Sequence, residues 1–143
     1  SSAHLRHSSL STHKKVLIQI ACFLHRELPI RLAHRVVELE SSSTLMKSKS
    51  IRDVCSWYKQ SFSQIRHTPS PTSPEKEEQF AKVIESIYER HSNTLIIMAR
   101  GSNELRQQFK KEGIDFSKQT EIQQTLDEFY FSRIAIRTVA YYV

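Results

Sequence analysis

Residues 23–35 read Phe-Leu-His-Arg-Glu-Leu-Pro-Ile-Arg-Leu-Ala-His-Arg, which places a proline, three arginines and two histidines inside an otherwise helical pattern. Pro29 has no backbone N–H and its ring clashes with the preceding turn, so a helix must kink or break close to Leu28. Apolar residues recur at helical spacing on both sides of this proline. The stretch therefore predicts a helix from about residue 11 to residue 28 that continues, after a kink, from Ile30 to Glu40.

Three further helices are expected from the same periodicity. Serine and threonine at residues 41–44 end the first one, because their hydroxyl groups compete for backbone hydrogen bonds. The second spans about residues 50–66. Ser73-Pro74-Glu75 then opens a third helix with a capping serine, a first-turn proline and an early acid. This third helix is expected to be the longest, with one apolar face for about eight turns up to Gly113. The last helix runs from about residue 118 towards residue 142.

The fold class that follows is all-α: an antiparallel four-helix bundle with a proline-kinked N-terminal helix. A chain of 143 residues has the length of one domain, and only two glycines and four prolines interrupt it. Residues 1–11 are expected to form a flexible basic tail and residues 12–143 the bundle. The first 26 residues contain no aspartate or glutamate, so the tail is either the end of an organelle transit peptide or a cloning or linker tail.

The charge balance limits the classes of partner. The net charge is +6 and the pI is about 9.5, which favours an acidic partner. The basic residues are scattered along every segment and form no dense patch, so nucleic-acid binding is not expected. No apolar run reaches the length of a membrane span. Cys22 and Cys55 are too few for a disulfide framework or a metal site, and both are expected to be buried free thiols.

The chain lacks the parts that phosphoryl transfer requires. ATP chemistry needs a glycine-rich phosphate loop and ligands for magnesium, and Gly101 and Gly113 are the only glycines present. No serine lies in a glycine elbow, which argues against nucleophilic catalysis. A histidine-based zinc site would need clustered ligands, whereas His4 and His7 lie in the tail. Catalytic, cofactor-binding and metal-binding residues are therefore not expected here.

Several polar side chains instead fall on apolar helical faces. His91 lies on the apolar stripe of the third helix, Tyr58 and Ser61 share a face of the second, and Arg133 and Arg137 are one turn apart on the last. A buried arginine needs a carboxylate or another anion. The anion is either a side chain of the protein, such as Asp53 or Asp127, or a ligand.

Four segments resemble one known family, the mitochondrial protein kinases that act on pyruvate dehydrogenase and on the branched-chain 2-oxoacid dehydrogenase. Glu27-Leu28-Pro29-Ile30-Arg31-Leu32-Ala33 is similar to the E-L-P-(V/I)-R-(L/I)-A segment of that family. The other three resemblances follow in the family's order: Ser56-Trp57-Tyr58-Lys59-Gln60-Ser61-Phe62, Arg90-His91-Ser92-Asn93 with Met98-Ala99, and Leu126-Asp127-Glu128-Phe129-Tyr130-Phe131-Ser132-Arg133-Ile134-Ala135-Ile136-Arg137.

The resemblance implies the regulatory and docking bundle of a larger enzyme. Such kinases bind ATP and magnesium in a separate C-terminal domain, whose D-x-G-x-G and G-x-G segments are absent here, so these residues alone are expected to be inactive. The full-length protein would be a homodimeric protein serine kinase of the mitochondrial matrix that phosphorylates and inactivates pyruvate dehydrogenase. Its partners would be the decarboxylase component, as substrate, and the lipoyl domain of the acyltransferase core.

Two sites are carried over from the family. The first is a central pocket for small carboxylates such as pyruvate and dichloroacetate. Tyr88 and Glu128 stand where the family often has basic residues, which weakens this expectation. The second is an apolar slot for the lipoyl group, assigned to Phe23 and Leu24. The residues that match the lining of the carboxylate pocket are Leu32, Tyr58, Ser61, Ile87, His91, Ser132, Arg133, Ile136 and Arg137.

Three alternatives remain open. The kinase could act on the branched-chain dehydrogenase, because His34 and Arg35 are similar to residues of branched-chain and plant members, whereas Trp57-Tyr58 favours pyruvate dehydrogenase. The chain could also be a non-catalytic module that binds lipoyl domains without an ATP domain. A histidine-kinase dimerisation bundle with His91 as phosphoacceptor is the weakest of the three, because Ser92 replaces the acid expected after that histidine.

Overall fold

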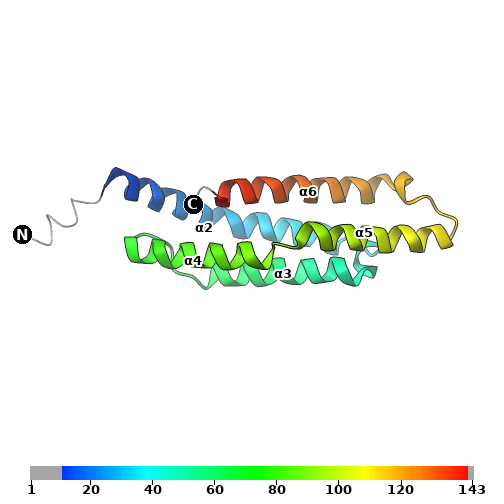
Figure 1. Ribbon diagram of the computed structural model, residues 1–143, viewed down its shortest axis with the longest axis horizontal. Helices are drawn as coiled ribbons and strands as arrows, with labels where there is room; N and C mark the ends of the chain where they lie inside the picture. The colour runs from blue at the N-terminus through cyan, green and yellow to red at the C-terminus, as the bar shows by residue number, and fades with distance from the viewer. Residues whose placement is uncertain (1–10, 142–143) are drawn as a thin grey trace, which may run out of the picture.

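The computed structural model describes residues 11–141, with side chains up to Ile134, and most of these residues lie in helices joined by short loops (Figure 1). No strand occurs among them, so the all-α class is confirmed. The long helices are α2 (Thr12–Glu40), α3 (Lys49–Arg66), α4 (Pro74–Arg90), α5 (Thr94–Lys111) and α6 (Thr120–Tyr141). Two short 3₁₀ helices, η1 (Leu45–Lys47) and η2 (Phe116–Lys118), lie in the connections.

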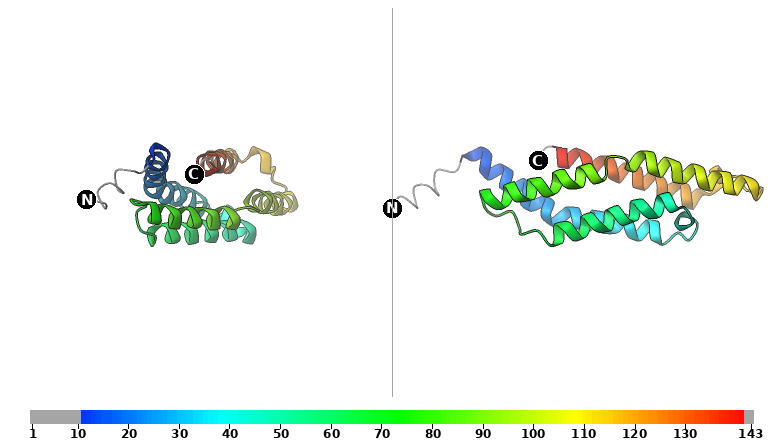
Figure 2. Two further views of the ribbon diagram at one scale, coloured as in Figure 1. Left: turned by 60° about the vertical axis from the view of Figure 1, so that its left-hand side comes forward. Right: turned by 60° about the horizontal axis from the view of Figure 1, so that its bottom comes forward.

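The helices lie side by side along the long axis of the molecule (Figure 1). Helices α2, α4 and α5 run in one direction, and α3 and α6 run in the opposite direction, as the two further views also show (Figure 2). Helix α2 packs most extensively against α3, which in turn packs against α5, while α6 lies against α2. Short connections of this kind favour antiparallel neighbours.

Helix α2 continues through Pro29 without interruption, so the predicted alternative of a break at Leu28 is wrong. The Ser11 hydroxyl caps its start by accepting a hydrogen bond from the Lys14 N–H at 3.1 Å. An interior proline costs a helix about 3 kcal/mol. The burial of a full stripe of apolar side chains against α3 offsets this cost: Ala21, Leu24, Leu28, Leu32, Val36 and Leu39. The kink itself remains a prediction.

The predicted third helix is in fact two helices, so its expected status as the longest helix is wrong. Helix α4 ends at Arg90, a turn follows at residues 91–93, and α5 begins at Thr94. Asn93 stands at the N-cap position of α5, and asparagine and serine favour such positions over helix interiors. Tyr88, before this turn, and Leu95, after it, are both exposed, so the apolar face is not continuous across the turn. It lies midway along the bundle (Figure 1).

The predicted helix signals at Ser73 and Gly113 are confirmed. The Ser73 hydroxyl accepts from the Lys76 N–H at 3.3 Å, with Pro74 in the first turn. Gly113 follows α5 with φ of 75°, a conformation that favours glycine. A Cβ on Gly101 would lie 2.7 Å from Ile51 Cγ1 and 2.8 Å from Ser48 Oγ, so α5 and the start of α3 can approach only because this residue is glycine.

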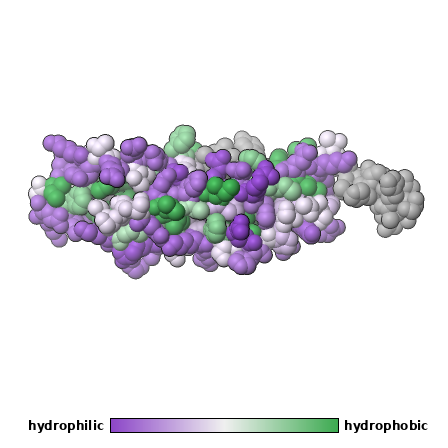
Figure 3. All heavy atoms as spheres, turned by 180° about the vertical axis from the view of Figure 1, so that it is seen from behind, coloured by the Kyte–Doolittle hydropathy of each residue, from purple (hydrophilic) through white to green (hydrophobic). Residues whose placement is uncertain are grey.

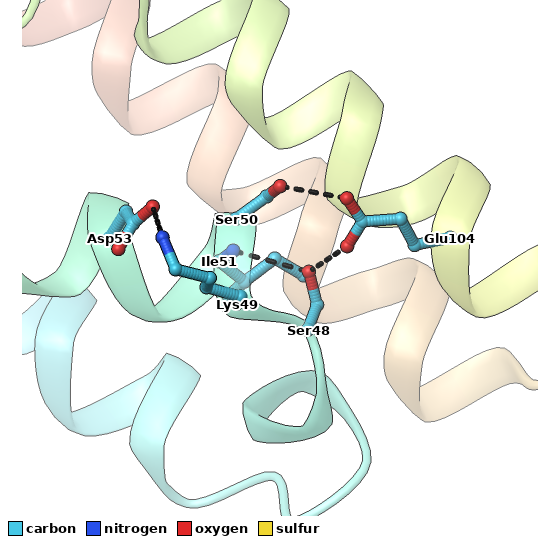
Figure 4. Close-up of polar contacts among 6 residues, drawn as sticks. All are labelled: Ser48, Lys49, Ser50, Ile51, Asp53 and Glu104. Carbon is cyan, nitrogen blue, oxygen red and sulfur yellow. Dashed lines mark hydrogen bonds and ion pairs between the residues drawn. The ribbon is translucent and has the colours of Figure 1, made fainter.

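A carboxylate holds the same junction together one turn beyond Gly101 (Figure 4). Glu104 accepts hydrogen bonds from the Ser48 hydroxyl at 3.0 Å and from the Ser50 hydroxyl at 2.9 Å. Ser48 also caps α3 by accepting from the Ile51 N–H at 3.3 Å. A negative charge close to a helix N-terminus is favourable, because the unpaired N–H groups give that end a partial positive charge.

One apolar core runs along the bundle and contains residues from every long helix. Its largest fully buried side chains include Tyr58, Phe80 and Phe129. On the face that points away from the viewer in Figure 1, hydrophilic residues surround small separate apolar patches (Figure 3). No helix within residues 11–141 is long and apolar enough to cross a membrane.

Candidate functional site

A cluster of polar side chains lies where α3, the α4–α5 turn and α6 meet. Arg90 Nη1 donates a hydrogen bond to Ser61 Oγ at 2.9 Å, and Ser61 Oγ lies 2.7 Å from His91 Nε2. Arg133 of α6 donates from Nη2 to the backbone carbonyl of His91 at 3.1 Å. The side chains of three elements therefore converge on the residue that ends α4.

His91 is neutral in this setting. Burial lowers the pKa of His91 from its ordinary value of 6.5 to about 4; a hydrogen bond with the Trp57 backbone raises it, and the charges of Arg90 and Arg133 lower it again. The Trp57 backbone and Ser61 supply hydrogen-bond partners for the ring. A neutral imidazole held in this way is fixed in orientation.

Tyr58 forms the apolar wall of the cluster. Its ring stacks on the His91 ring with centroids 4.6 Å apart and planes 16° apart, and on its other side it packs against Phe129 at 5.4 Å. Burial raises the pKa of the Tyr58 hydroxyl to about 12, although the charges of Arg133 and Arg35 lower it. Tyr58 therefore keeps its proton and can act as a hydrogen-bond donor.

The structure brings together four of the residues predicted for the carboxylate pocket: Tyr58, Ser61, His91 and Arg133. Arg133 is only 8% exposed and is one of the few buried charged residues. Leu32 lies in the apolar core and Ile87 packs against it, while Ser132 is half-buried. The side chains of the remaining two predicted residues, Ile136 and Arg137, lie outside the described residues.

Arg90 is a member of the cluster that the sequence did not predict. Helical periodicity places it beside the apolar stripe, and only the end of α4 at this residue turns its guanidinium group towards Ser61. The sequence feature that could have indicated this role is the position of Arg90 directly before His91, a residue already predicted for the pocket. With Arg133, it gives the cluster guanidinium groups on two sides, the kind of group that binds carboxylates in a bidentate manner.

The two departures from the family pattern are both exposed. Tyr88 is 44% exposed on α4. Glu128 is exposed on α6, where Gln124 donates to its carboxylate at 3.3 Å and its backbone carbonyl accepts from Arg35 Nη1 at 3.3 Å. Of the acids considered as partners of the arginines, Asp53 pairs with Lys49 at 3.2 Å and Asp127 is exposed.

The two residues predicted to bind the lipoyl group differ in accessibility. Leu24 is 1% exposed and belongs to the core, whereas the ring of Phe23 is 42% exposed on the same helix. The guanidinium group of Arg26 lies 5.9 Å from the Phe23 ring centroid, a cation–π contact that leaves a positive charge beside the exposed ring. Phe23 is therefore the residue of the pair that can meet a partner.

The side chains of the cluster suit an anion better than a metal ion. Among the residues that the structure describes, no group of three histidine, cysteine or acidic side chains lies close enough to hold a metal ion. Neither cysteine forms a disulfide. Burial and the charge of Glu40 raise the pKa of Cys55 to about 11, although the charge of Lys59 lowers it. The Cys55 thiol therefore keeps its proton and is a poor nucleophile. Guanidinium groups, a tyrosine hydroxyl and a serine hydroxyl around one apolar wall can hold a small carboxylate.

Comparisons with known proteins agree on one family. Residues 2–141 match the family described as mitochondrial branched-chain alpha-ketoacid dehydrogenase kinase. The chain is 38% identical over 130 residues, 90% of its length, to an Arabidopsis thaliana protein named mitochondrial [pyruvate dehydrogenase (acetyl-transferring)] kinase. It is 37% identical over 80% of its length to the Ascaris suum protein of that name, and 36% identical over 80% to human isozyme 3. The chain spans 34%, 29% and 28% of these relatives, respectively.

Proposed function

This chain belongs to the family of mitochondrial branched-chain alpha-ketoacid dehydrogenase and pyruvate dehydrogenase kinases and corresponds to the N-terminal domain of these proteins. We propose that it is the regulatory and lipoyl-domain-docking bundle of a protein serine kinase. The kinase acts in the mitochondrial matrix on pyruvate dehydrogenase and inactivates it. The full-length protein is a homodimer that holds ATP and magnesium in a further domain. The relatives named as pyruvate dehydrogenase kinases support this choice of substrate over the branched-chain dehydrogenase.

The observation that carries the regulatory part is the polar cluster of Tyr58, Ser61, Arg90, His91 and Arg133. It ties α3 and α6 to the turn that separates α4 from α5. A small carboxylate that pairs with the guanidinium groups of Arg90 and Arg133 would compete for the contacts that now hold this turn. Its binding energy can therefore bias the orientation of α5 relative to α4. This is how a metabolite would act on a domain attached to the bundle.

The docking part is supported by charge and by one exposed ring. The net charge of +6 suits an acidic lipoyl domain. Phe23 offers an accessible aromatic surface beside the positive charge of Arg26. The lipoyl chain is apolar, so its burial against this ring adds to the electrostatic attraction.

The pocket is tested by the binding of pyruvate and dichloroacetate, measured by calorimetry and by the shift in melting temperature. We expect Arg133→Met and Arg90→Met to weaken binding at least about tenfold, since each removes one charged hydrogen-bonding group worth about 1.5–3 kcal/mol. Arg100→Met, at an exposed position of α5, is the matched control and should leave the affinity unchanged. If the unaltered chain binds neither acid at about 10 mM, where a Kd of about 1 mM would be detected, the pocket assignment is wrong.

The docking site is tested with lipoylated and unlipoylated lipoyl domains. Phe23→Ala should weaken binding of the lipoylated form, whereas Val37→Ala, which truncates a residue 67% exposed on the same helix, should not. Equal affinities for the two forms of the domain would contradict an apolar slot for the lipoyl group.

The assignment of the whole protein is tested on the native molecule. An antibody against this segment should capture, from mitochondria, a protein far heavier than 143 residues allow, together with a dehydrogenase complex. The captured kinase should phosphorylate pyruvate dehydrogenase faster than the branched-chain enzyme. The opposite preference would favour the branched-chain alternative, and a protein near the size of this chain would favour the non-catalytic module.

A further inference from the structure

The connection between α3 and α4 carries an unusual sequence. Three of the four prolines in the chain lie at residues 69–74, and each follows a hydroxyl residue: Thr68-Pro69, Ser70-Pro71 and Ser73-Pro74. Such dipeptides are the acceptor motif of proline-directed protein kinases. A residue before proline is driven towards extended backbone, the conformation in which these kinases bind their substrates. The structure shows no helix or strand at residues 69–72.

The three hydroxyl groups differ in what they already do. Thr68 is buried, and its hydroxyl donates to the Gln64 carbonyl at 2.6 Å. Ser73 is half-buried and uses its hydroxyl to cap α4. Ser70 is exposed, and its hydroxyl has no hydrogen bond among the residues that the structure describes. Of the three hydroxyl groups, only that of Ser70 can therefore take up a phosphate without giving up a hydrogen bond of its own.

The segment around Ser70 is held in place from α2. His25 Nε2 lies 2.7 Å from the Thr68 carbonyl oxygen, and Cys22 Sγ donates to the Pro71 carbonyl at 3.5 Å. Pro71 is buried. Contacts on both sides of Ser70 thus hold the loop that carries its hydroxyl. The loop turns at Pro71, where the Thr72 N–H donates to the Ser70 carbonyl at 2.8 Å, and Arg66 and His67 are exposed just before it.

We propose that Ser70 is a phosphorylation site for a proline-directed protein kinase and that its phosphate weakens docking at Phe23. The γ-phosphoryl group of ATP is transferred to Ser70 Oγ, the bond from the γ-phosphorus to the ADP leaving oxygen breaks, and the hydroxyl proton passes to the catalytic base of that kinase. The product carries a charge of about −1.5 to −2 at pH 7 and three strong acceptor oxygens. The exposed Arg66 guanidinium is a suitable partner for these oxygens.

The effect on docking follows from position and charge. Cys22, which contacts Pro71, directly precedes Phe23, and Ser70 directly precedes Pro71, so the modified loop packs against the turn of α2 that carries the docking ring. At low salt, where the Debye length is about 30 Å at 0.01 M, a charge on this loop acts on the field around that ring. A dianion there repels an acidic partner and reduces the positive field next to Arg26. This second half rests on the proposed docking function, whereas the modification itself does not.

The site is tested by incubating the chain with ATP and a purified kinase of the cyclin-dependent class, and separately with one of the mitogen-activated class. Fragment masses should place the phosphate on Ser70. Ser70→Ala should lower the rate of incorporation at least about tenfold, and Ser73→Ala, the matched control in the same loop, less than about twofold. Phosphate on Ser73 in preference to Ser70, or no incorporation at Ser70 by either kinase, overturns the proposal.

The consequence is tested with the lipoylated domain. The phosphorylated chain and Ser70→Glu should both bind it several-fold more weakly than Ser70→Ala, and the difference should shrink as salt is added. If a fully phosphorylated chain binds the lipoylated domain with unchanged affinity, the proposed effect on docking is wrong, although the phosphorylation site itself is still correct. A failure of the proposed docking function would be seen separately, because Phe23→Ala would then leave the affinity for the lipoylated domain unchanged.

Discussion

His91 shows how far the surroundings of one residue change its chemistry. A solvent-exposed histidine titrates near 6.5, whereas burial between Tyr58 and Ser61 lowers the pKa of His91 to about 4. The folded chain thus excludes a proton that the unfolded chain binds. The same burial that orients the imidazole therefore makes stability depend on pH.

We expect the free energy of unfolding to fall as the pH is lowered from 6.5 towards 4. In this window the unfolded state protonates His91 and the folded state does not, which gives a loss of at most about 3 kcal/mol at pH 4. Urea unfolding at a series of pH values should show a flatter dependence for His91→Gln than for the unaltered chain. His67→Gln, at an exposed histidine, is the control and should keep the original slope. Equal slopes for His91→Gln and the unaltered chain would contradict a depressed pKa.

At the scale of elements, the junction between α5 and the start of α3 depends on the absence of a side chain. Gly101 lets Ser48 and Ile51 approach its Cα, and Glu104 then reaches the hydroxyl groups of Ser48 and Ser50 (Figure 4). Glycine inside a helix is otherwise unfavourable, so its presence here is typical of a close approach between elements. The neighbours could not be predicted, since they lie about fifty residues away in the chain.

We expect Gly101→Ala to destabilise the protein by about 1 kcal/mol in urea unfolding. Alanine improves the helix by about 1 kcal/mol, but its Cβ would lie 2.7 Å from Ile51 Cγ1, and overpacking costs about 1–3 kcal/mol. Asn103→Ala, at an exposed position of α5, gains helix propensity without a clash and should be neutral or stabilising. A Gly101→Ala protein more stable than the original would show that Ile51 yields readily to the added methyl group.

At the scale of the whole molecule, the two proposed sites lie on different elements of the bundle. Its polar cluster lies at the turn between α4 and α5, where three elements meet. The exposed ring of Phe23 lies on α2, which extends past the proline towards the end of the bundle (Figure 1). Under the proposed function, a small anion and a partner protein would therefore bind to different parts of the bundle.

We expect the isolated chain to ignore ATP. Magnesium–ATP at about 100 times a typical Kd would stabilise a binding protein by about 2.7 kcal/mol, and here it should leave the melting temperature unchanged. The chain should also fail to transfer phosphate to purified pyruvate dehydrogenase. The captured full-length kinase is the positive control. A melting shift with ATP that is absent with magnesium alone would contradict a bundle that lacks the nucleotide site.

The sequence alone determined the features that depend on near neighbours in the chain. Apolar periodicity and the signals at Ser73 and Gly113 predicted the all-α class and most helix ends, because caps and turns act within one or two turns of backbone. Tyr58, Ser61, His91 and Arg133 were recognised as polar groups on apolar faces for the same reason. Only the tertiary structure decided the turn at residues 91–93, the recruitment of Arg90 to Ser61 and the burial that keeps His91 neutral. These features depend on which helices pack against each other. The free energy of that packing comes from contacts between residues far apart in the sequence, so no local sequence pattern predicts it.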